Sequence, residues 1–252
     1  MSLDLRPAAA PAPRIRRILR HALMETRLLA RNGEQLLLAL VIPLALVAGQ
    51  AAFGERLGIA TDPFIASVVA LGLWSSGFTS PAITTAFERR YGVLERLVAT
   101  PLRRSDLLAG KAVMIAAVAT GQASVVVVAA LLAGWAPTPV AAQGLVLAAT
   151  VPLALAAFAG LALSLAGRAS AELTLGLANL VYLLGAAGGL LVPVTAFPAW
   201  AQPLLRTLPT PALGETVRTW AGGGFDPMPL LVVIGWAIAA LALARKVFRW
   251  TS

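Results

Sequence analysis

The chain has no cysteine, only one histidine among 252 residues, and charged side chains at just 12% of positions. The lack of cysteine excludes disulfide frameworks, thiolate nucleophiles and zinc–thiolate sites. The single histidine, His21, excludes a multi-histidine metal site. Serine and threonine residues in the spans also lack a histidine partner, which is the usual base for such nucleophiles. We expect His21 to lie on a surface helix, in contact with solvent or the membrane interface.

Charge is scarce because apolar residues replace it: they make up 59% of the chain, and the mean hydropathy is +0.83. A soluble domain of this size cannot hide so much apolar surface, because about half of its residues must face water. The composition therefore excludes an ordinary cytosolic enzyme, a disordered chain and a nucleic-acid-binding module, despite the net charge of +9. It indicates an all-α integral membrane protein.

Apolar stretches predict six transmembrane helices, since about 20 residues are needed to cross the hydrocarbon core. The 56 residues between Lys111 and Arg168 carry no charge and fit two helices joined by a turn at Gly134–Pro139. The six predicted spans are Leu36–Phe53, Pro63–Phe87, Ala112–Gly134, Gly144–Ala166, Leu173–Val192 and Leu230–Ala244.

Lysine and arginine predict the orientation of these spans. With six helices, 17 basic residues fall on the side of both termini and of the 88–111 loop, and 3 fall on the other side. We therefore expect a multi-pass protein of the inner (plasma) membrane, with both termini in the cytoplasm.

The segment before the first span has two parts. Residues 1–13, rich in alanine and proline, predict a disordered tail. Residues 14–33 place apolar side chains at helical spacing, with arginines and Glu25 elsewhere on the surface, which predicts an amphipathic helix lying on the anionic inner leaflet. The alternative is a basic anchor with no further role. Residues 34–252 are then the transmembrane domain.

The spans lack the groups that power transport. No acidic residue falls well inside a span, although ion-driven carriers usually keep ionisable groups there. The phosphate-loop pattern is also missing, because Gly110-Lys111 is followed by Ala112. Three classes of protein remain: a passive pore, a scaffold, or the membrane subunit of a transporter whose energy comes from a separate chain.

The segment Phe87–Lys111, FERRYGVLERLVATPLRRSDLLAGK, predicts a short helix over about 88–100 that ends before Pro101. One face of this helix carries Tyr91, Leu94, Leu97 and Val98, and Arg89, Glu95 and Arg96 point away from it. Such a helix, held between two spans, would transmit a movement of a bound partner protein to the membrane-spanning helices. The alternative is an ordinary amphipathic loop at the interface.

This loop resembles the signature loop of type-2 ABC exporter permeases, the group that includes daunorubicin-type drug exporters. Two further segments are similar to that family: ALMETRLLARNGEQLLLALVIPLAL to its connecting helix and first span, and FPAWAQPLLRTLPTPALGE to its extracellular re-entrant segment, here about 193–228. Tyr91 departs from the family's usual small or polar residue. The matching loop positions are Glu88, Gly92, Leu94, Glu95, Leu97, Thr100, Pro101, Arg104, Leu107, Gly110 and Lys111.

The resemblance implies a permease subunit that pairs with a second permease, as a homodimer or heterodimer, and rests on separate ABC ATPase subunits. ATP and Mg would be bound by those ATPase subunits, and no cofactor by this chain. The loop helix would be the coupling helix, and Arg27 and Arg31 of the connecting helix would pack beside it. The residues implied to contact the ATPase are Glu88, Gly92, Glu95, Arg96, Thr100, Pro101 and Arg104.

In the family that it resembles, the substrate cavity lies at the subunit interface, lined by spans two and five. The aromatic or hydrogen-bonding side chains available there are Trp74, Phe78, Thr84, Asn179 and Tyr182. A hydrogen bond between helices explains Asn179 equally well.

The resemblance thus implies a permease that exports its substrate by alternating access, and the uncharged lining of the spans favours a hydrophobic or amphipathic cargo (drug, lipid or lipid-linked molecule). The permease is not itself an enzyme, and it binds lipid bilayer and protein partners but no nucleic acid. A non-transporting membrane scaffold or channel subunit is the alternative.

Overall fold

The computed structural model describes residues 12–31, 33–98, 100 and 102–248. Six of its helices are long and apolar enough to cross a membrane, which confirms the predicted number of spans. The tail predicted for residues 1–13 lies almost wholly outside the described residues, as do Pro101 and residues 249–252.

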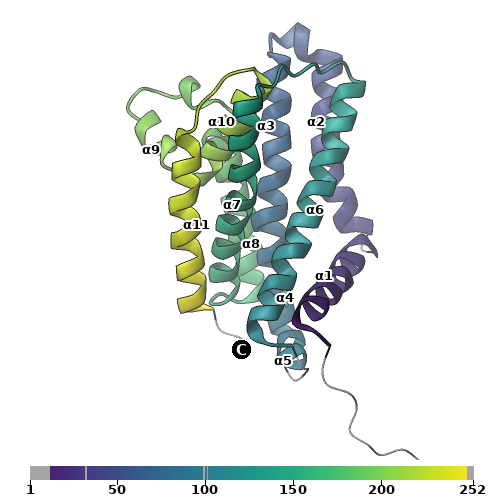
Figure 1. Ribbon diagram of the computed structural model, residues 1–252. Helices are drawn as coiled ribbons and strands as arrows, with labels where there is room; N and C mark the ends of the chain where they lie inside the picture. The colour runs from purple at the N-terminus through teal and green to yellow at the C-terminus, as the bar shows by residue number, and fades with distance from the viewer. Residues whose placement is uncertain (1–11, 32, 99, 101, 249–252) are drawn as a thin grey trace, which may run out of the picture.

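The spans form a bundle whose two ends carry different short helices (Figure 1). The helix α1 (Arg14–Arg31), the short α5 (Val93–Val98) and the end of the last span lie at one end, and α9 (Gln202–Arg206) and α10 (Pro209–Ala221) lie at the other. The six spans are α2 (Gly33–Leu57), α3 with η1 and α4 (Thr61–Trp74, Ser75–Thr79, Ser80–Arg90), α6 (Arg104–Leu132), α7 (Ala141–Ala166), α8 with η2 (Ala171–Gly185, Ala186–Leu190) and α11 (Met228–Val247); a 3-10 turn, η3 (Val194–Ala196), precedes α9.

Most of the spans are longer than the sequence predicted. The third span begins at Arg104 rather than near Ala112, since Asp106 accepts a hydrogen bond from the Arg103 amide (3.4 Å) and caps the helix. The predicted turn at Gly134–Pro139 is confirmed: Gly134 has a φ of +93°, which a glycine adopts without strain.

Two spans contain a π-helical turn. In the second span, η1 separates α3 from α4 near the middle of the helix. In the fifth span, η2 ends the helix, and Gly189 there has a φ of +105°. Such turns widen the helix locally and are common at functional positions.

An aromatic cluster fills the centre of the bundle. The ring of Trp74 stacks on Phe78 and meets the edge of Phe158, with both centroid separations at 4.6 Å. Small residues let the helices approach: a Cβ at Gly160 of α7 would lie 2.8 Å from the Ala240 carbonyl carbon of α11. The bundle is therefore held by close packing around one aromatic core.

At the α9–α10 end, the side chain of Arg218 is buried and fully engaged. It donates hydrogen bonds to Ser67 Oγ (2.7 Å) on α3 and to the carbonyl oxygens of Leu190 (2.6 Å) and Gly189 (3.0 Å). It also pairs with Glu215 at 2.9 Å. One guanidinium group thus ties α10 to the second span and to the broken end of the fifth.

We predict that Arg218→Met destabilises the protein by about 2 kcal/mol, because it strands two buried carbonyl oxygens and the paired carboxylate. Arg206→Met makes the same charge change on the exposed surface of α9 and should cost less than about 0.5 kcal/mol. Thermal unfolding in detergent micelles measures both, and equal losses would contradict this role for Arg218.

Candidate functional site

The loop between the second and third spans folds as a helical hairpin rather than as the single helix expected over about 88–100. The helix α4 ends at Arg90, Tyr91 and Gly92 turn the chain, and α5 follows. Gly92 has a φ of +65°, which explains the break. Arg96 closes the turn by donating to the carbonyl oxygens of Tyr91 (2.7 Å) and Gly92 (3.2 Å).

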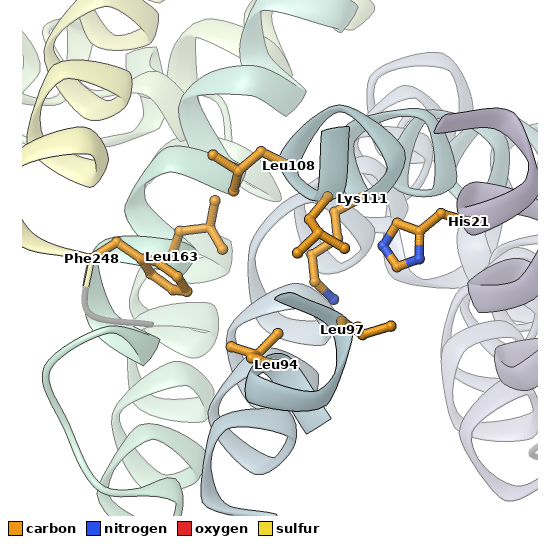
Figure 2. Close-up of a pocket in the computed structure, with 8 residues that line it drawn as sticks. His21, Leu94, Leu97, Leu108, Lys111, Leu163 and Phe248 are labelled. Atoms are coloured by element: carbon orange, nitrogen blue, oxygen red, sulfur yellow. The ribbon is translucent and has the colours of Figure 1, made fainter. Parts of the chain in front are cut away.

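The helix α5 presents a buried face and an exposed face. Leu94 is only 1% exposed, and it lines a small apolar pocket with Leu97, Leu163 and Phe248 (Figure 2). Glu95 and Arg96 are exposed, as the sequence predicted, but Tyr91 is 62% exposed and does not join the buried face. The hairpin therefore exposes the charged side chains of Glu95 and Arg96, while Leu94 anchors α5 to the bundle.

Behind α5 lies a buried ion cluster that joins three helices. Lys111 of α6 lies 2.7 Å from Glu88 Oε2 of α4 and 3.1 Å from Glu25 Oε1 of α1. The side chains of Lys111, Glu25 and Glu88 are 8%, 7% and 16% exposed. Removing Lys111 would leave two buried carboxylates without their shared cation, which is costly.

His21 completes this cluster, so the expectation of an exposed histidine was wrong. It is 4% exposed, and its Nε2 lies 3.1 Å from Glu25 Oε1. Burial raises the pKa of Glu25, but the hydrogen bond from His21 and the charges of Lys111 and His21 outweigh it, so the pKa lies below the ordinary value of 4.5. Glu25 is therefore ionised at neutral pH.

A second contact fixes α1 against the start of α6. Asp106, fully buried, lies 2.7 Å from Arg14 Nε and 3.2 Å from Arg17 Nη2. Between the two ionic contacts, Gly110 lets the helices touch: a Cβ there would lie 2.4 Å from the His21 ring. The polar face of α1 thus packs on α6.

The apolar face of α1 points away from the bundle. Arg27 and Arg31 are exposed as well. The exposed apolar side chains of α1, each 43–70% accessible, are Ile15, Leu19, Leu23, Met24 and Leu28.

The base of the hairpin is also tied to the fifth span. Arg89 donates to the Ala169 carbonyl oxygen (2.7 Å), and Arg90 forms an ion pair with Glu172 at the start of α8. Among the other residues expected in the loop, Thr100 donates to the Leu97 carbonyl oxygen (2.6 Å). Arg104 is the first residue of α6, and Pro101 lies outside the described residues.

A cleft of about 640 Å³ opens within the membrane-spanning part. It is lined by the second, third and fifth spans, by α2, and by Thr26, Leu29 and Ala30 of α1. Because Glu25 belongs to the ion cluster, α1 borders both the cluster and the cleft.

The five residues expected along a substrate path fall in three places. Asn179 and Tyr182 line the cleft. Trp74 and Phe78 are buried in the aromatic cluster, where the Trp74 Nε1 donates to the Tyr182 carbonyl oxygen (3.4 Å). Thr84 donates to the Ser80 carbonyl oxygen of its own helix (2.6 Å).

A family model described as ABC-2 family transporter protein matches residues 15–245, which take in α1, all six spans and the hairpin. The chain belongs to the ABC-2 transporter family. No curated protein matches it significantly. This ABC-2 protein is the transmembrane component of a transporter of that type, and its 252 residues contain no nucleotide-binding domain.

Sequence reasoning missed the residues of this ABC-2 protein that hold the hairpin in place. Gly110 and Lys111 stood out only as loop-pattern positions, Glu88 was expected at the ATPase contact, and His21 and Glu25 were assigned to the surface of the first helix. One signal was available: His21 and Glu25 are four residues apart on one helix face, a spacing that pairs side chains. Helical periodicity within α1 could not identify their partner, Lys111, because Lys111 lies on another helix far along the chain.

We predict that the stability contributed by Glu25 is present above about pH 4.5 and is lost as the pH falls through its lowered pKa. Glu25→Gln should therefore lower the apparent melting temperature at neutral pH. The difference in melting temperature between variant and wild type, the gap, should narrow on acidification. Glu55→Gln, at an exposed position of α2, should show no such gap. A gap that stays constant from pH 7 to about pH 3.5 would contradict the assignment.

Proposed function

We propose that the ABC-2 protein is the permease subunit of an ATP-driven exporter, and that the hairpin carrying α5 is its coupling element. ABC-2 permeases generally pair with ABC ATPase subunits. One observation carries the proposal. The exposed, charged side chains Glu95 and Arg96 of α5 lie next to the buried Lys111 cluster, and that cluster joins α1, α4 and α6.

The orientation follows from charge. The end that carries α1, α5 and the last turn of α11 holds most of the lysines and arginines, so we place it in the cytoplasm. The exposed apolar face of α1 would then enter the inner leaflet beside Arg27 and Arg31, as an interfacial helix. Residues 193–228, with α9 and α10, would form the extracellular re-entrant segment.

The fifth span supports a second permease subunit. Asn179 is exposed in the single chain, near the middle of that span. Lipid tails offer an amide no hydrogen-bond partner, so such a side chain normally faces protein or a cavity. We therefore propose that the second subunit covers this face and closes the cleft into a shared cavity.

Coupling would run from α5 through the ion cluster to α1, whose Thr26, Leu29 and Ala30 line the cleft. When the ATPase pair closes on ATP and moves α5, Lys111 carries that movement to Glu25 and so to the wall of the cavity. The cargo would be a hydrophobic or amphipathic molecule, since the cleft lining is largely apolar. ATP and Mg would be bound by the ATPase subunits.

We predict that Glu95→Arg weakens the association with the ATPase subunit at least about tenfold, because it reverses an exposed charge at the tip of α5. Glu55→Arg makes the same change on an exposed position at the opposite end of the bundle and should leave association intact. Co-purification from the native membrane, followed by transport in proteoliposomes, measures both. If Glu95→Arg keeps wild-type association and transport, α5 is not the coupling element.

A further inference from the structure

The cleft combines apolar walls with a band of uncharged hydrogen-bonding groups. None of its described lining residues is acidic or basic. The polar side chains that line it are Thr26, Ser75, Ser76, Thr79, Ser80, Gln122, Asn179 and Tyr182. A ligand that enters it would therefore meet hydroxyl and amide groups but no counter-ion.

This band lies at mid-depth and is centred on the π-helical turn of the second span. Ser75, Ser76 and Thr79 belong to η1, in the central part of the Thr61–Arg90 helix. Ser76 donates a hydrogen bond to Gln122 of α6, which joins two walls of the cleft. The widened turn thus places hydroxyl groups where a regular span would place apolar side chains.

One group in the band lacks a partner. The Thr79 hydroxyl is buried and makes no hydrogen bond among the described residues, while the residue itself is partly exposed and lines the cleft. A hydroxyl in this state is costly unless something supplies a partner. At the rim of the same band, Asn179 adds an exposed amide near the middle of the fifth span.

From these observations, which extend the proposed function, we infer that the cleft binds an uncharged amphipathic molecule with a hydroxyl- or amide-bearing head. The head lies against η1, Gln122 and Asn179, and the apolar chain lies along Leu40, Ile42 and Val125. The volume of about 640 Å³ falls within the roughly 300–1,000 Å³ of small-molecule sites. A charged head would be left without a counter-ion at membrane depth, which disfavours it.

The test uses the full chain in lipid nanodiscs and three photoreactive probes with hydrocarbon chains of the same length: a monoacylglycerol, a fatty acid and an alkyltrimethylammonium. We expect the monoacylglycerol to label the cleft walls about tenfold more than either ionic probe. Thr79→Val combined with Asn179→Leu should cut that labelling about fivefold.

Thr150→Val is the matched control, because its hydroxyl is also buried and unpartnered in a span but lies outside the cleft. Equal labelling by all three probes, equal effects of the Thr79 and Thr150 variants, or a cleft closed to every probe by lipid or a second copy would overturn the inference. The two proposals can fail separately. If the probes do not label the cleft but Glu95-dependent ATPase binding is intact, only the inferred substrate class is wrong. If the cleft is labelled but no ATPase subunit binds, only the exporter proposal is wrong.

Discussion

The pairing of one buried lysine constrains the whole inner end of this protein. Lys111 lies near the start of the third span, where an unpaired ammonium group is costly, and both Glu88 and Glu25 lie within about 3 Å of it. Glu88 ends the second span, and Glu25 lies on α1, so the pairing fixes three helices at one point. The hairpin between Glu88 and Lys111 is consequently seated on a base that cannot deform without separating charges.

The same helix that satisfies Lys111 also borders the cleft. The Glu25 face of α1 packs against α6, while Thr26, Leu29 and Ala30 line the cavity. In the proposed coupling, a displacement at the hairpin would therefore reach the cavity wall through this one helix. The opposite end has its own tie in Arg218, which joins α10 to the second and fifth spans. The cleft thus lies between two buried charge networks.

Much of this architecture could be predicted from composition. The six spans, the turn at Gly134 and the exposed Glu95 all follow from charge and hydropathy, because those patterns are local. The break at Gly92 and the π-helical turn at Ser75–Thr79 were missed, since both depend on backbone conformation. His21 and Glu25 were assigned to the wrong face: an arginine-rich helix looks solvated in isolation, and their partner Lys111 lies 86 residues beyond Glu25. Trp74 and Phe78 were expected along a substrate path, but their size suits them to the core that they fill.

The central claim is that the ion cluster transmits the movement of α5 to the cavity. The ratio of substrate moved to ATP hydrolysed, measured for Glu88→Gln in the reconstituted complex, tests it most directly. This variant leaves Lys111 paired with Glu25, so the helices stay assembled while the link to the second span is weakened. The account predicts that the ATPase subunits remain bound and hydrolyse ATP while the ratio falls at least about fivefold. A ratio equal to that of wild type would contradict it.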